Sequence, residues 1–233
     1  MAIYIIGDLH LSYGTDKPMD VFGENWEKHT EKLKKDWLEK VSQEDTVILA
    51  GDFSWAMYLK DTYNDFDFIK KLPGRKLLLK GNHDYWWTTI KSMREYLKLN
   101  DFENIDFIYN NSYEIENKII VGTRGWTLND NDNGEKMINR EIGRLELSIK
   151  SAIEKFGHEK EIICILHYPP LSKTNINNKF TEILKKYNIK KCYYAHLHGN
   201  SHKEAVEGNI DGIEYKLVSG DYLDFKLVKI VDK

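Results

Sequence analysis

The chain has 233 residues, of which 41% are hydrophobic and 30% are charged, and its formal net charge is −3. These values are ordinary for a globular protein with a substantial core, and they give no reason to expect nucleic acid or an anionic membrane as the main partner. No apolar run approaches membrane-spanning length and the first one is too short for a signal peptide, so we expect a soluble, cytoplasmic protein.

The first half of the chain alternates predicted strands and helices. Strands are expected where short apolar runs occur, and helices where apolar residues recur at helical spacing. The strands are 3–6, 47–50 and 77–79, and the helices are 26–41, 65–72 and 88–97. This βαβαβ order predicts a parallel sheet covered by helices.

The second half begins with short strands that Asn-Asn and Glu-Asn turns connect, which predicts hairpins. The predicted elements are strands 105–109, 113–116 and 118–122, a polar loop 129–134, a helix 136–156, strands 162–166 and 192–195, and a hairpin-like segment 201–228. Cys164 and Cys192 lie inside two of these apolar runs, and we expect them to be reduced core residues. Since no linker or repeat interrupts the pattern, we predict one α/β domain over residues 1–233, with two packed mixed sheets flanked by helices.

Five short polar clusters follow strand ends. They are Asp8-Leu9-His10, Gly51-Asp52, Gly81-Asn82-His83-Asp84, His167 and His196-Leu197-His198. The carboxyl ends of parallel strands lie along one edge of a sheet, so these clusters should converge into one pocket. Imidazole and carboxylate ligands together favour Zn, Fe or Mn over Ca or Mg, and the pocket is predicted to bind two such ions.

This ordered set resembles the calcineurin-like metallophosphoesterases, whose pattern is D-x-H, G-D, G-N-H-[DE], a lone His and G-H-x-H. The resemblance extends from Asp8 to His198, and one position departs from it, because Ala195 stands where the last motif usually has Gly. It implies a four-layer α/β/β/α sandwich and a phosphoester hydrolase with two divalent metal ions, most readily Mn, Fe or Zn.

The resemblance also implies which residues bind each ion. The first ion would take Asp8, His10, Asp52 and His198. The second would take Asp52, Asn82, His167 and His196. A carboxylate has two oxygens, so Asp52 is the natural shared ligand, and the net positive charge of the loaded site would favour a phosphate.

His83 lies beside the metal ions in the family pattern without binding them. There it would stabilise or protonate the departing oxygen, and the alternative is a structural hydrogen bond within its turn. The chain lacks the G-D-x-x-D-R-G motif of the protein Ser/Thr phosphatases, which argues against that activity. Arg124, between two glycines, is a candidate phosphate ligand in place of the missing arginine; a surface arginine in a tight turn is the alternative.

Four tryptophans follow the motif or candidate site loops, namely Trp55, Trp86, Trp87 and Trp126. They either line a substrate pocket and stack on a planar leaving group, or pack to order the loops. His29, His158 and His202 fall outside every motif, and we expect them at the surface.

We therefore predict that a hydroxide bridging two metal ions attacks phosphorus in line with the leaving oxygen of a small phosphorylated substrate. Monoesters, diesters and nucleotide pyrophosphates are all compatible with such a site. The alternative from another class is a metal-binding scaffold that has the fold without the turnover.

Overall fold

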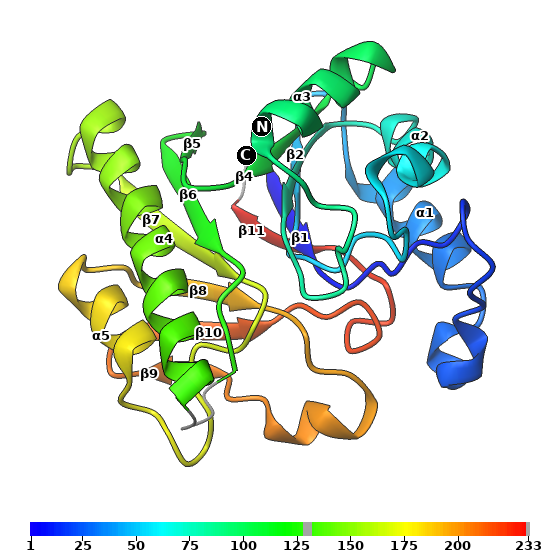
Figure 1. Ribbon diagram of the computed structural model, residues 1–233. Coiled ribbons are helices and arrows are strands. Elements are labelled where there is room, and N and C mark those ends of the chain that lie inside the picture. The colour runs from blue at the N-terminus through cyan, green and yellow to red at the C-terminus, as the bar shows by residue number, and fades with distance from the viewer. Residues whose placement is uncertain (128–131, 232–233) are drawn as a thin grey trace.

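Two β-sheets lie face to face in the computed structural model, which describes residues 1–127 and 132–231 (Figure 1). The first sheet has the strand order β11-β1-β2-β3-β4. Its strands are β1 (Ile3–Ile6), β2 (Thr46–Leu49), β3 (Arg75–Leu79), β4 (Ile105–Ile108) and β11 (Val228–Val231). Neighbouring strands are parallel except for β11, which pairs antiparallel with β1.

The second sheet has the order β5-β6-β7-β8-β10-β9. Its strands are β5 (Tyr113–Ile115), β6 (Lys118–Thr123), β7 (Glu161–Leu166), β8 (Lys191–Tyr194), β9 (Gly208–Ile210) and β10 (Ile213–Leu217). The four central strands are parallel, and β5 and β9 pair antiparallel at the two edges. Both sheets are therefore mixed, as predicted.

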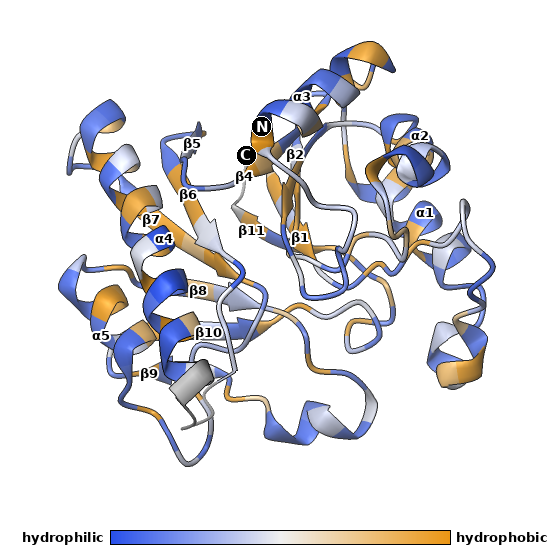
Figure 2. Cartoon of the chain, viewed as in Figure 1, coloured by the Kyte–Doolittle hydropathy of each residue, from blue (hydrophilic) through white to orange (hydrophobic). Residues whose placement is uncertain are grey.

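Side-chain alternation along the strands separates three layers of core. Ile3 and Ile5 point into the space between the sheets, where they join Ile163 and Ile165 of β7. The intervening residues of β7 face outward: Cys164 is buried there as a free thiol. Figure 2 shows the hydrophobic residues concentrated on the strands between mixed helices. Strands buried on both faces explain the nearly continuous apolar runs of the sequence.

Helices cover both outer faces and complete the four-layer α/β/β/α sandwich. On the first sheet lie α1 (His29–Lys40), α2 (Tyr63–Lys70) and α3 (Ile90–Leu99), and on the second lie α4 (Asp132–Phe156) and α5 (Lys179–Lys186). Four 3-10 turns are η1 (Asp20–Phe22), η2 (Glu24–Trp26), η3 (Leu59–Thr62) and η4 (Gly199–Glu204). No helix in the described part of the chain has the length and apolarity that a membrane span requires.

The predicted hairpin between residues 105–109 and 113–116 is wrong. β4 pairs with β3 in the first sheet, whereas β5 pairs with β6 in the second, so the chain crosses between the sheets at this point. Asn110 has a left-handed backbone, and the side chain of Asn111 accepts from the Tyr109 amide at 2.7 Å. The Asn-Asn signal therefore marked a turn, but the partner strands depend on tertiary packing.

Three helices, α1, α5 and α4, also differ from the prediction. The first begins at His29 rather than residue 26, because Glu24–Trp26 forms a separate 3-10 turn and Lys28 has a left-handed backbone. The helix α5 was not predicted, although Asn178 and Thr181 form a capping box at its start. Helix α4 starts at Asp132, so residues 132–134 of the predicted polar loop 129–134 are helical instead, and residues 129–131 lie outside the described ranges.

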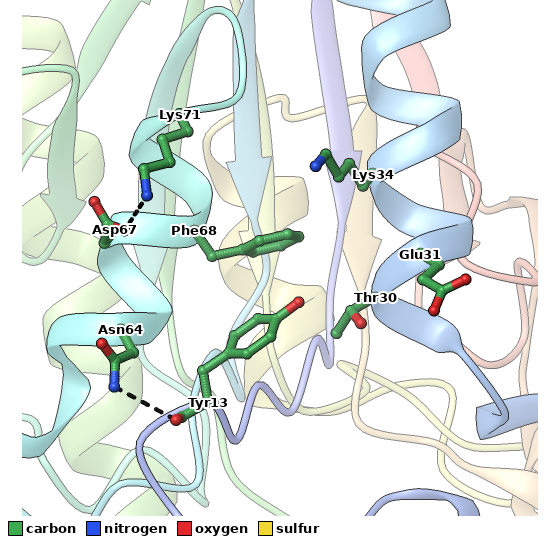
Figure 3. Close-up of a pocket in the computed structure, with 8 residues that line it drawn as sticks. All are labelled: Tyr13, Thr30, Glu31, Lys34, Asn64, Asp67, Phe68 and Lys71. Atoms are coloured by element: carbon green, nitrogen blue, oxygen red, sulfur yellow. Dashed lines mark hydrogen bonds and ion pairs between the residues drawn. The ribbon is translucent and has the colours of Figure 1, made fainter.

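A surface groove of about 510 Å³ lies between α1 and α2 (Figure 3). The ring of Tyr13 packs on that of Phe68 in it, with centroids 5.1 Å apart. Its charged residues have both signs, and none of the predicted site residues lines it. The groove is thus separate from the site predicted from the motifs.

Candidate metal centre

The loops after β1, β2 and β3 of one sheet and after β7 and β8 of the other carry the five polar clusters. Several cluster residues have left-handed backbones directly after their strands. They are Asp8 (φ 56°), His10 (φ 45°), Asp52 (φ 50°) and His196 (φ 76°). Residues other than glycine adopt this conformation uncommonly, and such residues gather at functional sites. Here the conformation breaks the strand direction at the shared edge of the sheets.

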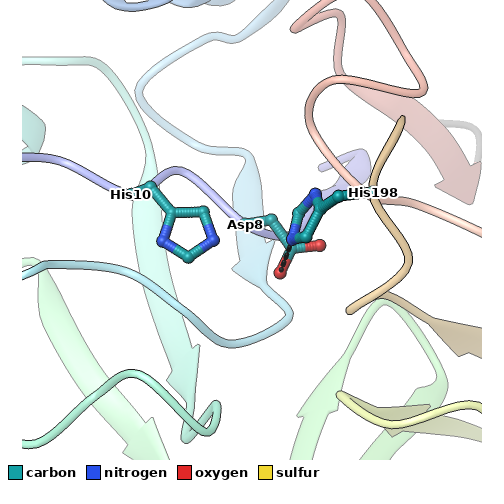
Figure 4. A group of neighbouring side chains, drawn as sticks. All are labelled: Asp8, His10 and His198. Atoms are coloured by element: carbon teal, nitrogen blue, oxygen red, sulfur yellow. Dashed lines mark ion pairs between the residues drawn. The ribbon is translucent and has the colours of Figure 1, made fainter. Parts of the chain in front are cut away.

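Two groups of potential metal ligands form at this edge. In the first, the ligand atoms of Asp8, His10 and His198 all lie within 4.8 Å of one another (Figure 4). In the second, the same limit holds for Asp8, Asp52 and His167. All of these residues except His198 are buried, and the two groups are contiguous because both contain Asp8.

The remaining predicted ligands, Asn82 and His196, adjoin the second group. The Oδ1 atom of Asn82 lies 2.7 Å from Nε2 of His167. The His196 ring is 5.1 Å from the His167 ring, and its backbone amide donates to Asp8 at 2.9 Å. The structure therefore brings all seven residues of the predicted ligand set together.

Burial and clustered charge shape the ionisation of the carboxylates. Burial, together with the nearby Asp84 and Asp8 carboxylates, raises the pKa of Asp52 well above its ordinary value. Burial also opposes ionisation of Asp8, but the imidazoles of His198 and His167 outweigh it and hold the pKa of Asp8 below its ordinary value. A cation placed among these groups would relieve the repulsion between the carboxylates.

Several buried polar atoms of the cluster accept or donate no hydrogen bond. Among them are Oδ1 of Asp8, Oδ2 of Asp52 and Nε2 of His198. Orphaned buried atoms are costly, and oxygen and imidazole nitrogen together suit divalent Mn, Fe or Zn. Burial also lowers the pKa of His196 to about 3, which keeps its ring in the neutral form that binds metal. The residues present therefore fit a metal centre.

Asp84 holds the two central loops in place. Its buried carboxylate accepts from the backbone amides of Gly81 (2.7 Å), Asp52 (3.0 Å) and Phe53 (2.9 Å), and from the Trp86 indole (3.0 Å). A Cβ atom at Gly81 would come within 2.0 Å of Oδ1 of Asp52, so only glycine fits there. The G-N-H-D motif thus positions Asp52 through its first and last residues.

Asp221, which was not among the predicted site residues, holds His198 in a similar way. Its carboxylate accepts from the Gly199 amide at 3.0 Å and lies 2.9 Å from Nδ1 of His198 and 3.2 Å from Nε2 of His202. Burial opposes protonation of His198, but Asp8 and Asp221 outweigh it and raise the pKa of His198 to about 10. Asp221 follows β10, outside every motif, and its only sequence signal was a Ser-Gly-Asp turn after a strand.

The expectation of surface positions for the histidines outside the motifs is partly wrong. His29 is buried against Trp26 and Phe225, and the His202 side chain is 19% exposed and paired with Asp221. His158 is exposed, as predicted. A lone histidine in sequence does not reveal whether a neighbouring element covers it.

His83 lies beside the ligand cluster and belongs to neither ligand group. Its backbone amide donates to Oδ1 of Asp52 at 2.7 Å, and its ring packs on Trp55 with centroids 4.5 Å apart. Burial lowers the pKa of His83, and the nearby His167 and Lys17 lower it further. The ring is thus disposed to be neutral and able to donate a hydrogen bond.

Arg124 lies 3.5 Å from buried Glu141 through Nη2 and stacks over the Trp126 ring at 4.5 Å. Its side chain is only 15% exposed, so the alternative of a surface arginine is wrong. The backbone oxygen of Arg124 accepts from the amides of His167 (3.2 Å) and Tyr168 (2.8 Å). This turn therefore positions the loop that carries His167.

The tryptophans divide between the two predicted roles. Trp86 and Trp87 are buried in the core under the loops, which confirms packing for this pair. Trp126 packs on Tyr168. Trp55 stacks on His10 with centroids 4.7 Å apart and lines a cavity beside the cluster. Trp26, which lies in the 3-10 turn η2 and not in the predicted helix, lines the same cavity.

Comparisons with known proteins agree with this architecture. A family model described as calcineurin-like phosphoesterase matches residues 1–200. The Gene 66 protein of Mycobacterium phage L5 is 32% identical over 81 residues, which cover 35% of this chain and only 39% of the phage protein.

Solved structures are similar over nearly the whole chain. Phosphopantetheinyl hydrolase (PptH) of Mycobacterium tuberculosis has a TM-score of 0.60 and 13% identity, covering 100% of this chain and 96% of its own. TT1561 of Thermus thermophilus has a TM-score of 0.57 and 12% identity, covering 98% and 97%. AQ665 of Aquifex aeolicus, described as a protein of unknown function, has a TM-score of 0.51 and 21% identity, covering 98% and 95%. At these identities the likeness concerns the fold alone.

Proposed function

The chain belongs to the calcineurin-like phosphoesterase family, and on this premise we propose that it is a phosphoester hydrolase that uses two divalent metal ions. The observation that carries the proposal is the pair of ligand groups that share Asp8, with orphaned carboxylate oxygens buried among imidazoles. Structural cores do not normally leave such atoms without partners.

The proposed ligands of the first ion are Asp8, His10, Asp52 and His198, and those of the second are Asp52, Asn82, His167 and His196. Asp8 belongs to both ligand groups, whereas Asp52 belongs to one; the position of Asp52 between two imidazoles nevertheless supports its role as the shared ligand. Its Oδ2 atom lies 3.6 Å from Nε2 of His10 and 3.5 Å from Nε2 of His167. Nδ1 of His167 lies 3.0 Å from the backbone oxygen of Ala50, which leaves Nε2 for a metal ion.

When bound, the two cations would supply an activated water to attack phosphorus in line and positive charge for the phosphoryl oxygens. His83 would donate a hydrogen bond to the departing oxygen, which suits its lowered pKa and its place outside the ligand groups. Asn82 would contact the phosphoryl group from the second ligand group. Arg124 would add donors, since its Nε atom is buried without a partner.

The site also supports treating residues 1–233 as one phosphoesterase unit. The first sheet supplies Asp8, His10 and Asp52, and the second supplies His167 and His198. Neither sheet alone would complete a ligand group, because Asp8 occurs in both groups with a histidine from the opposite sheet.

The test is a panel of chromogenic phosphomonoesters, phosphodiesters and nucleotide pyrophosphates, assayed after metal depletion and reloading with Mn, Fe or Zn. We expect hydrolysis of at least one class only when metal is present. Asp52→Asn should abolish it, because a neutral amide bridges two cations poorly. Full metal occupancy without hydrolysis of any ester would contradict the proposal and favour the metal-binding scaffold.

A further inference from the structure

A cavity of about 610 Å³ opens directly beside the candidate metal centre. His10, His83 and His198 form its boundary with the ligand cluster. Its size lies in the range of roughly 300–1,000 Å³ that is typical of small-molecule pockets. A group attached to a phosphate at the centre would enter this space.

Aromatic and apolar side chains form the outer part of the cavity. They are Met19, Phe22, Trp26 and Trp55. Trp26 is 5% exposed and packs on Phe225, and Trp55 stacks on His10, so these two rings are held in place. Phe22 is 58% exposed and belongs to the short turn η1 at the entrance.

The charged residues of the cavity disfavour an anionic occupant. Among the described residues that line it, Glu24 and Asp221 are acidic and none is lysine or arginine. The Asp221 carboxylate is engaged with His198. Lys17 lies over the Trp55 ring, 3.0 Å from its centre, but is not part of the lining. A further phosphate or a carboxylate in the outer part of the cavity would therefore meet Glu24 and find no lysine or arginine in the lining to pair with.

His83 lies where the cavity meets the site of the proposed reaction. It lies beside the ligand cluster, packs on Trp55 and lines the cavity. If His83 faces the departing oxygen, the carbon skeleton bound to that oxygen extends into the cavity. Uncharged planar groups gain most from such walls, because they bury apolar area and stack on rings.

We propose that this cavity binds the leaving group of the substrate, and that the substrate class is a phosphoester with an uncharged, planar aromatic leaving group. This inference rests on the proposed function. The inference adds to the proposed function that Phe22, Trp26 and Trp55 select the substrate. It also adds that leaving groups with further phosphates are excluded.

The test compares 2-naphthyl phosphate with phenyl phosphate, whose leaving groups are chemically alike but differ by one ring. Wild-type protein loaded with Mn should have the higher kcat/KM for the naphthyl ester. Phe22→Ala should lower the naphthyl-to-phenyl ratio by about ten-fold, since it removes apolar area that only the larger group covers. Val21→Ala is the matched control, because Val21 is 70% exposed in the same turn and does not line the cavity; the ratio should not change.

Binding of 2-naphthol, measured by calorimetry, provides a readout that does not need turnover. It should weaken in Phe22→Ala and not in Val21→Ala. Hydrolysis of both esters with an unchanged ratio in Phe22→Ala would overturn this inference while the proposed function stands. Absence of hydrolysis of every phosphoester by metal-loaded protein would overturn both, even if naphthol bound.

Discussion

The Nδ1 atom of His198 lies 2.9 Å from the carboxylate of Asp221, while Nε2 of the same ring lies 3.5 Å from Oδ1 of Asp8. One imidazole thus connects a carboxylate outside the motifs to one inside them. Such an outer carboxylate fixes the orientation of a metal-binding histidine and raises its basicity. The candidate centre therefore includes more than the seven residues of the predicted ligand set.

Asp221→Asn should weaken metal binding by about 10- to 100-fold. A neutral amide is a weaker hydrogen-bond acceptor for Nδ1 of His198 than a carboxylate, and its nitrogen cannot accept from the Gly199 amide. Calorimetric titration of metal-depleted protein with Mn would measure this. Asp224→Asn, three residues further on and with a 58% exposed side chain, is the matched control. Equal affinities for the two variants would contradict the role of Asp221.

His83→Ala should reduce turnover by roughly 10²–10⁴-fold while both metal ions remain bound, because the residue lies beside the ligand groups and serves the leaving oxygen. Kinetics together with elemental analysis of metal content would test both parts. Tyr85→Phe removes only the hydroxyl 3.5 Å from Nδ1 of His83 and should have little effect. Loss of metal from His83→Ala would assign the residue a ligand or structural role instead.

Gly7→Ala should destabilise the fold by about 1–3 kcal/mol, because a Cβ atom at Gly7 would lie 2.5 Å from Cβ of Ala195. Ala195 stands where the family motif usually has Gly, and the absence of a side chain at Gly7 leaves space for its methyl group. The double variant Gly7→Ala, Ala195→Gly should recover much of the loss in urea unfolding. Gly143→Ala, where the added methyl meets no atom within 4 Å, should not destabilise. Additive effects in the double variant would show that the two residues do not compete for space.

Asp65 should make stability depend on pH. Burial raises the pKa of Asp65 to about 6 from an ordinary 3.8, against the hydrogen bonds from Ser54 and from the Tyr13 amide. Since the pKa of Asp65 is higher in the folded protein than in the unfolded one, its contribution to folding stability is complete below pH 3.8. This contribution is lost as the pH rises through about 6. The resulting decrease in the free energy of unfolding is on the order of 3 kcal/mol.

Asp65→Asn cannot ionise, so its stability relative to wild type should increase between pH 4 and about 7. Urea unfolding at several pH values, with EDTA present to exclude metal binding, would measure the difference. Asp16→Asn, at an exposed position, is the control and should follow wild type throughout. A constant difference between Asp65→Asn and wild type across this range would show that Asp65 stays ionised in the folded protein.

Local patterns in the sequence were enough to predict which strands are followed by metal-binding residue types and which residues those are. Apolar runs such as Ile3–Ile6 and residues 162–166 are local signals, because a strand buried on both faces requires apolar side chains at nearly every position. Parallel order then places Asp8 and Asp52 at one edge of the first sheet. The remaining members of the ligand set, including His167 and His198 after strands of the second sheet, were predicted from the resemblance of the motif order to a known family.

The way those side chains are held, and the cavity that lies beside them, depend on contacts between distant segments of the folded chain. The amide of His196 donates to Asp8 across 188 residues of sequence, and His198 meets Asp221 from a different loop. The Trp26 and Trp55 walls of the cavity come from separate segments. Such contacts depend on sheet pairing and loop conformation, which follow from the packing of the whole chain; a local pattern of residues does not encode them.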